Sequence, residues 1–379
     1  MSGVHLRTVG SAVPAHAASQ AAACRFMQEL AAHQLGVAGD RKQVERWQRF
    51  IATVHDRSAI DRRHAVLGDY LRRPADFTFF PSNGALEPFP STAARMAVYE
   101  REAPALARTA AERALAAAGV AAADVSSLVV VSCTGFFAPG PDIALVRALG
   151  LRPDVERAVI GFMGCYAAFN GLRHALASCR ADPSAAVLVV CVELCSLHFQ
   201  REVTANNVVA NALFADGAAA ALVTGAGHPK GGLVIVDSYA SLVAGAESLL
   251  GWTIGDTGFQ MTVDPALPGA LRDSAGGHVD RALGRVGAKR ADVGRWAVHP
   301  GGRRILDAVG AHLGLDPDPD EGELAPSYRV LRDYGNMSSP TVLFILERIL
   351  EARPARDELV LALGFGPGLT ADSMLLRAA

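Results

Sequence analysis

The stretch VIGFMGCYAAFNGLRHALASC, residues 159–179, decides how the rest of the chain is interpreted. A short apolar run ends at Gly164, and a helical segment follows Cys165. A helix N-terminus carries roughly half a positive charge, which lowers the pKa of a thiol placed there. Free cysteine is also among the most buried residue types. Position alone therefore leaves open whether Cys165 is a nucleophile or a buried thiol that fills space.

Around this stretch, strand-like and helix-like segments alternate. The β-branched runs SSLVVVSC (126–133) and AAVLVVCVEL (185–194) predict buried strands. Helical patterns cover 19–50 and 93–119, whereas 65–92 is rich in Pro, Gly and aromatic residues and predicts irregular structure. Alternation of this kind is typical of an α/β fold whose parallel or mixed sheet is covered on both faces.

Two segments share one layout. LVVVSCTGFFAPGPDIALVRALGL and RWAVHPGGRRILDAVGAHLGL each run from an apolar stretch through Pro and Gly to an amphipathic helix that ends in Leu-Gly-Leu. The likeness is typical of a duplicated α/β fold, although strand–loop–helix units also recur by chance. With GAGHPKGG (225–232) as the junction, the sequence predicts an N-terminal half, 1–228, and a C-terminal half, 229–379.

Composition narrows the class of protein. Half of the 379 residues are hydrophobic, which allows a large core, and the net charge is −2 without a basic run, which argues against a nucleic-acid partner. No apolar stretch reaches the roughly 18 residues of a membrane span, and no secretory signal is recognised. The six cysteines form no CxxC pair and no zinc spacing, so we expect a reduced cytoplasmic protein without a metal.

A nucleophilic cysteine needs a base and a stabiliser for the developing oxyanion. His299 follows an apolar run and precedes Pro-Gly-Gly, which places it at a strand end, where active sites of α/β folds collect. Asn336 lies where a loop enters a helix. A core histidine and a helix N-cap are the structural alternatives for these two residues. The glycine-rich stretch 364–377 predicts a loop that forms a turn or approaches a ligand closely.

Together these motifs resemble one family. GFMGCYAA, HPGGRRILD, YGNMSSPTVLFIL and GFGPGLTADS occur in the order found in the type III polyketide synthases, the chalcone synthase superfamily. SAIDRRHAVL, CTGFFAPGPDIALVRALGLRP and NALFADGAAAALV extend the resemblance over essentially the whole chain, and its character is bacterial. The resemblance implies a thiolase-like fold with two similar halves in five layers, αβαβα, and a homodimer.

The resemblance also implies a mechanism. Cys165 would take an acyl group from a CoA starter, and His299 and Asn336 would bind the thioester carbonyl of malonyl-CoA. They would promote decarboxylation by stabilising the enolate oxygen, a task suited to preorganised donors. His299 would further hold Cys165 ionised as its imidazolium partner. Malonyl units would be condensed repeatedly before cyclisation, and CoA thioesters would be substrates, with no separate cofactor.

Further site residues follow from the resemblance. Phe214 and Phe259 match two gatekeepers between the CoA tunnel and the cavity, for which core packing is the alternative. Arg57, Gly301 and Gly302 would contact CoA, although Arg57 equally fits a solvated surface position. The remaining expected residues are those of the cavity, Cys133, Thr134, Ala138, His198, Leu250 and Ser338, and those of a cyclisation loop, Gly364, Phe365, Gly366, Pro367 and Gly368.

Differences between the expected cavity residues of this chain and those of plant chalcone synthases indicate the class of the starter. Ala138 stands where plant chalcone synthases have a methionine that reaches into the cavity of the partner subunit, and Cys133 where they have threonine. Both positions resemble bacterial members that thread a long acyl chain. Phe136 and Phe137 are the residues that would refill the space. His198 and Leu250 alter the pocket for aromatic starters. We therefore expect a fatty acyl-CoA starter and an alkylpyrone or alkylresorcinol product.

Two other functions stay open on the sequence. A ketoacyl synthase III shares the fold and a Cys-His-Asn set, but it performs one condensation with a carrier-protein substrate, and GNMSS and GFGPG disfavour it. A non-catalytic thiolase-like scaffold that binds an acyl chain is the alternative from another class. The complete set of Cys165, His299 and Asn336 argues against a scaffold, which has no need of all three.

Overall fold

Nine strands form one sheet in which two groups meet. The computed structural model describes residues 3–36 and 41–379. The strand order is β11-β12-β13-β8-β1-β7-β6-β4-β5, and β1 joins β8 through only two residue pairs. The first group is β1 (His5–Ala12), β4 (Ser127–Ser132), β5 (Glu156–Gly161), β6 (Ala186–Leu194) and β7 (Asp216–Thr224). The second is β8 (Leu233–Leu242), β11 (Val293–Val298), β12 (Leu359–Gly366) and β13 (Thr370–Ala378).

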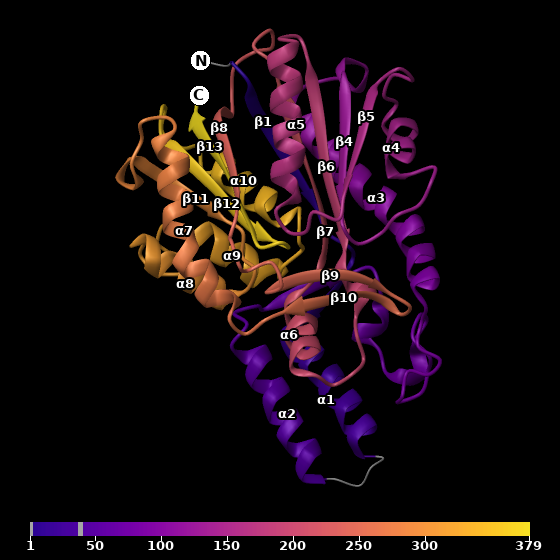
Figure 1. Cartoon of the computed structure of the whole chain (residues 1–379). Coiled ribbons are helices and arrows are strands. Elements are labelled where there is room, and N and C mark those ends of the chain that lie inside the picture. The colour runs from indigo at the N-terminus through magenta and orange to yellow at the C-terminus, as the bar shows by residue number, and fades with distance from the viewer. Residues whose placement is uncertain (1–2, 37–40) are drawn as a thin grey trace.

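Three separate cores show that the chain is layered. Helix α3 (Thr92–Ala118) packs on the outer face of the first group, and α7 (Leu267–Gly284) and α8 (Arg303–Leu313) pack on the outer face of the second. Between the groups lie α5 (Ala167–Ala181) and α10 (Thr341–Glu351) (Figure 1). Alternate residues of one strand therefore enter different cores, as the two-residue period of a strand requires. The fold is the five-layered thiolase-like α/β fold.

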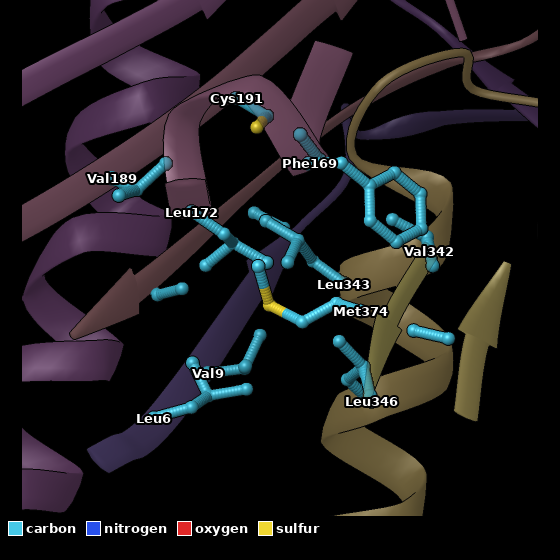
Figure 2. Close-up of a cluster of buried hydrophobic side chains, with 14 of the residues drawn as sticks. Leu6, Val9, Phe169, Leu172, Val189, Cys191, Val342, Leu343, Leu346 and Met374 are labelled. Atoms are coloured by element: carbon cyan, nitrogen blue, oxygen red, sulfur yellow. The ribbon is translucent and has the colours of Figure 1, made fainter. Parts of the chain in front are cut away.

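The central layer is closely packed. Figure 2 shows Phe169 and Leu172 of α5 facing Val342 and Leu343 of α10, with strand side chains such as Met374 closing the space. The small residues in α5 let it lie close to the sheet: a Cβ added at Gly171 would stand 2.7 Å from Val189. The start of α5, directly after Cys165, is thus held rigidly between both groups of strands.

The remaining elements gather mostly at the end opposite the two chain termini (Figure 1). They include α1 (Gln20–Gly36), α2 (Arg41–Asp56), α6 (Ala205–Leu213) and the hairpin of β9 (Leu250–Gly255) and β10 (Gly258–Val263). Short elements complete the chain: β2 (His16–Ser19), β3 (Arg62–Ala65), α4 (Pro141–Leu149), α9 (Ala325–Tyr334) and 3-10 turns. Among the described residues no helix is long and apolar enough to cross a membrane.

Most of the elements expected from the sequence are confirmed. The runs at 126–133 and 185–194 are β4 and β6, the helices expected within 19–50 and over 93–119 are α1, α2 and α3, and 65–92 is irregular apart from two 3-10 turns. Residues 1–2 and 37–40, which fall within the predicted first half, lie outside the described residues. Residue 228 lies between β7 and β8; the division into halves at that point stays a prediction.

The prediction of a loop over residues 364–377 is wrong. The segment is most of the antiparallel pair β12–β13, and only 367–369 form the turn. Its glycines serve packing inside β12: a Cβ on Gly364 would lie 2.6 Å from the ring of Phe169, and one on Gly366 would overlap the ring of Tyr166. Glycine inside a strand often marks a place where a neighbouring group approaches closely.

We predict that Gly10→Ala destabilises the protein by about 1–3 kcal/mol, because overpacking forces the backbone to shift. A Cβ at Gly10 in β1 would stand 2.7 Å from the carbonyl oxygen of Ala110 in α3, and a backbone oxygen cannot move aside. Urea denaturation measures the change. Gly284→Ala in α7, where nothing lies within 4 Å, is the matched control and should be neutral or slightly stabilising. Equal stability of the two variants would contradict the prediction.

Candidate active site

A tight turn places Cys165 at the entrance of α5. Phe162 and Gly164 take φ values of 59° and 81°, so the chain reverses between the end of β5 and the helix. Glycine is needed at position 164 for two reasons. Its positive φ favours glycine, and a Cβ there would overlap Pro367 of the β12–β13 turn. The predicted arrangement of strand, glycine turn, cysteine and helix is confirmed.

Two donors from the second half reach the Cys165 thiol. Burial raises its pKa to about 11, and hydrogen bonds from the side chains of Ser338 and Asn336 act in the opposite direction. Asn336 is fixed by a 2.8 Å bond from the backbone N–H of Ser338 to its Oδ1. Ser338 has a φ of 60°, a strained value for a non-glycine residue. The N-cap alternative for Asn336 is wrong, because Pro340 occupies the cap of α10.

His299 follows β11 directly, as expected, and is buried. Its backbone N–H donates to the oxygen of Leu363 at 2.8 Å, which aligns it with β12, and Gly366 of that strand lies against the backbone nitrogen of Cys165. Neither ring nitrogen of His299 has a hydrogen-bond partner among the described residues. Burial lowers its pKa to about 3, so the imidazole is neutral. The imidazolium–thiolate pair expected from the sequence is not formed in this structure, because nothing offsets the burial of the positive charge.

A buried carboxylate lies beneath the site. Glu193 of β6 accepts hydrogen bonds from the Cys133 backbone N–H at 2.9 Å, the Thr134 hydroxyl at 2.7 Å and the Ser339 hydroxyl at 2.5 Å. Burial raises its pKa to about 7, and these donors work against that rise. Glu193 therefore ties the loop after β4 to the GNMSS loop. Sequence reasoning missed it; the signal was one acidic residue inside the apolar run 185–194.

The loop after β4 supports Cys165 from behind. The Cys133 sulfur accepts a hydrogen bond from the Gly164 N–H at 3.1 Å, and burial raises the pKa of this thiol. Thr134 also accepts, through its hydroxyl, the N–H of Leu194 at 2.9 Å. Ala138 behaves differently: it is exposed and lies further along the loop. The expectation for Ala138 concerns the cavity of a partner subunit, and it stays a prediction.

A small hollow with a cavity volume of about 70 Å³ opens beside this centre. We call it the α1 hollow; its lining includes Ala23, Phe26, Met27, His198, Phe214 and Phe259. Both expected gatekeepers thus face one space. Phe214 is also coupled to the site through a backbone bridge with Asn336, whose N–H donates to the oxygen of Leu213 at 3.0 Å. The contribution of α1 to this lining had no signal in the sequence.

His198 fastens the hairpin over the hollow. Its Nε2–H donates to the Thr134 oxygen at 2.7 Å, and its Nδ1 accepts the Phe259 N–H at 2.9 Å. The imidazole stacks on the Phe259 ring with centroids 4.1 Å apart, and burial lowers its pKa to about 3. Trp252 of the same hairpin donates to the Cys133 oxygen at 2.9 Å. His198 is therefore a neutral structural contact as well as a cavity residue.

The other expected residues are spread more widely. Leu250 begins β9 and packs against the core of the second half, outside the lining of the α1 hollow. Arg57 is exposed just after α2. Gly301 and Gly302 lie between β11 and α8, and a Cβ on Gly302 would contact Leu213 at 3.4 Å, which places this turn beside the end of α6. Of the expected cyclisation loop, Gly364, Phe365 and Gly366 belong to β12 and Pro367 and Gly368 to the turn.

Comparison with known proteins agrees with this fold. Family models for the chalcone and stilbene synthases match residues 4–228 with the N-terminal domain and 234–379 with the C-terminal domain. The chain belongs to this family: it is a type III polyketide synthase, an acyltransferase.

Individual relatives show how close the likeness is. The 1,3,6,8-tetrahydroxynaphthalene synthase of Streptomyces peucetius is 39% identical over 277 residues, 72% of each chain. The alpha-pyrone synthesis polyketide synthase-like Pks18 of Mycobacterium tuberculosis is 35% identical over 288 residues, 74% of this chain and 72% of that one. The crystal structure of PKS-I from the brown alga Ectocarpus siliculosus superposes with a TM-score of 0.89 at 32% identity, covering 99% of this chain and 98% of that one.

We predict that Ser338→Ala moves the pH profile of Cys165 alkylation upward by about one pH unit, the value of one hydrogen bond to a charged group. The donor favours the thiolate, so its loss raises the pKa and slows reaction with iodoacetamide at a given pH. Peptide mass spectrometry follows Cys165 and, as an internal reference, the half-exposed Cys24. A Ser274→Ala control should leave both profiles in place; an unmoved Cys165 profile in Ser338→Ala would contradict the assignment.

Proposed function

We propose that this synthase condenses malonyl-CoA repeatedly onto an acyl group held on Cys165. The observation that carries the proposal is the meeting of both halves at one buried thiol. Asn336 and Ser338 donate to the Cys165 sulfur, and neutral His299 stands at the end of β11, beside the strand that touches the backbone of Cys165. Nucleophile, base and oxyanion donors are thereby gathered in a site from which bulk water is largely excluded.

Loading uses the neutral imidazole. The Cys165 sulfur attacks the carbonyl carbon of the starter thioester, and its proton passes to His299. The carbon–sulfur bond to CoA breaks, and the CoA thiolate leaves with the proton from His299. The acyl group remains on Cys165. Because both partners are neutral before the reaction, charge appears only transiently in the buried site.

In the extension step, Asn336 and His299 donate hydrogen bonds to the thioester oxygen of malonyl-CoA. The thioester carbonyl of malonyl-CoA accepts hydrogen bonds from the Asn336 amide and from an N–H of His299. The bond to the carboxylate carbon breaks, CO₂ leaves, and the electron pair forms an enolate whose oxygen the two donors stabilise. The enolate carbon then attacks the acyl carbonyl on Cys165, and the thiolate departs. Return of the lengthened chain to Cys165 permits a further round.

We assign a fatty acyl-CoA as the starter and an alkylpyrone or alkylresorcinol as the product. The α1 hollow supports this assignment, since most of its lining is Ala, Phe, Met and Trp. A relative named for alpha-pyrone synthesis and another named for tetrahydroxynaphthalene show the range of products in the family. Cys133 lies behind the catalytic loop and Ala138 on the surface, so the argument for the starter rests on the α1 hollow.

The cellular setting belongs to the same proposal. All six cysteines are free, among them two that flank the site, Cys133 and Cys195, as expected in a reducing compartment. CoA thioesters are intracellular metabolites of such a compartment. We therefore place the reaction in the cytoplasm, with acyl-CoA and malonyl-CoA as its small-molecule partners.

We predict that Cys165→Ala abolishes polyketide formation but retains release of CO₂ from malonyl-CoA, because the thiol carries only the acyl group. Asn336→Ala should slow CO₂ release about 10²–10³-fold, the cost of one oxyanion donor. Mass spectrometry of products with aromatic and saturated acyl-CoAs, together with a CO₂ assay, measures both. Cys24→Ala, a half-buried cysteine on α1, is the matched control and should behave like the wild type.

Three results would count against the assignment. Formation of polyketides by the Cys165→Ala variant would contradict the role of Cys165 as the residue that carries the acyl group. A single condensation that requires a carrier protein would favour a ketoacyl synthase III, and no turnover with any thioester would favour the scaffold. A preference for aromatic or short starters would retain the polyketide synthase but reject the fatty acyl starter.

A second copy of the chain is the partner we propose. β5 is an edge strand whose backbone groups on one side are unpaired, and edges of this kind are normally covered. Val159 in β5 is 50% exposed and Phe136 beside it is 40% exposed, with the Phe136 ring 5.6 Å from that of Phe162. Pairing of two β5 strands would cover this apolar edge and place Ala138, on the same loop as Phe136, near the interface.

We predict that Val159→Asp converts a dimer into monomers, because it puts a charge into an apolar strand pair. Light scattering during gel filtration gives the mass of each species. Val286→Asp is the matched control: Val286 is an exposed valine of similar size after α7, remote from β5, and the dimer should persist. A wild type that is monomeric, or a Val159→Asp variant that stays dimeric at the same concentration, would overturn the proposed interface.

A further inference from the structure

Three hydrogen bonds hold Cys133 from three directions. Its backbone N–H donates to Glu193 of β6 at 2.9 Å, and its carbonyl oxygen accepts the indole N–H of Trp252 at 2.9 Å. Its sulfur accepts the backbone N–H of Gly164 at 3.1 Å. Gly164 directly precedes Cys165 in the turn that leads into α5. A movement of Cys133 is therefore passed, through one hydrogen bond, to the residue before Cys165.

The bond from Trp252 differs from the other two, because it comes from outside the main sheet. Glu193 belongs to a central strand of the nine-stranded sheet, whereas Trp252 belongs to β9, which pairs only with β10. A two-stranded hairpin on its own is marginally stable, so the contacts of its side chains decide where it lies. The indole of Trp252 is thus the contact through which the hairpin holds Cys133.

A cluster of rings keeps this indole in place. The ring of Trp252 stands edge-on to His198 and Phe259, with centroids 5.6 Å and 5.9 Å away. His198 donates to the oxygen of Thr134, the residue after Cys133, at 2.7 Å. The same cluster therefore binds two consecutive carbonyl groups of the loop after β4. One hydrogen bond lets a loop swing about it, whereas two on neighbouring carbonyls fix both its position and its direction.

We propose that Trp252 is a positioning residue for the Cys165 thiol. Its indole N–H fixes Cys133, and the Cys133 sulfur fixes the turn of Gly164 and Cys165 from behind. The inference rests on the proposed function, because it concerns how the thiol that would carry the acyl group is held. Trp252 acts on this thiol through Cys133.

The other side of the Cys165 thiol depends on this placement. Asn336 and Ser338 donate hydrogen bonds to it, and both favour the thiolate. Hydrogen bonds weaken steeply when their distance and angle leave the preferred range, so a small displacement of the thiol weakens both and raises its pKa. The titratable groups gathered around this thiol are Glu193, Cys133, Cys195 and His299. Replacing an indole by a phenyl ring changes the charge of none of them.

The first test uses Trp252→Phe, which keeps an aromatic ring and removes the N–H. Peptide mass spectrometry follows alkylation of Cys165 by iodoacetamide as a function of pH. We expect the midpoint of the profile to rise by about half a pH unit, since the donors to the thiol are displaced but still present. Trp47→Phe, in α2 and edge-on to Phe50, is the matched control and should leave the midpoint in place. A hairpin that is merely looser would change the alkylation rate by one factor at every pH; an unmoved midpoint would overturn the inference.

A double-mutant cycle tests the route through Cys133. Cys133→Ala removes the sulfur that accepts the Gly164 N–H, and it should raise the midpoint by itself. Residues that act through one chain of contacts have non-additive effects. Adding Trp252→Phe to Cys133→Ala should therefore move the midpoint no further. Shifts that add in the double variant would overturn the role of Cys133 as the link.

Acylation kinetics separate this inference from the proposed function. At saturating octanoyl-CoA, the rate of Cys165 acylation should fall about tenfold in Trp252→Phe, the scale of one lost hydrogen bond, with the half-saturating concentration unchanged. A raised half-saturating concentration at an unchanged rate would make Trp252 a substrate contact and overturn the inference. Wild-type protein that no acyl-CoA acylates would reject the proposed function, and the alkylation midpoint would still decide whether Trp252 positions the thiol.

Discussion

The buried carboxylate of Glu193 is the interaction on which the geometry of the site depends. Burying a carboxylate away from water costs free energy unless hydrogen-bond donors surround it. Here the donors are the Cys133 N–H, the Thr134 hydroxyl and the Ser339 hydroxyl. These donors come from both halves of the chain. The contact therefore fixes the GNMSS loop relative to the first half, and Ser338, the neighbour of Ser339, is brought onto the Cys165 sulfur.

The two groups that we propose to react, Cys165 and His299, are buried and neutral, and this state has a consequence for the proposed catalysis. Burial acts on Cys165 and His299 in opposite directions on the pKa scale, but in both cases it favours the uncharged form. Charge must then develop on substrate oxygen and sulfur, close to donors that are already oriented. Asn336 is oriented by the backbone of Ser338 and His299 by its bond to β12. Preorganised donors of this kind lower a barrier without reorganising solvent.

The sequence was sufficient for features that are local along the chain. Apolar runs identified β4 and β6, and a histidine or cysteine at the end of such a run was correctly placed at a strand or helix terminus. The sequence was insufficient where a residue contacts another residue that is far away along the chain. Gly364 appeared to belong to a loop because the ring that needs its space, Phe169, lies about half the chain away.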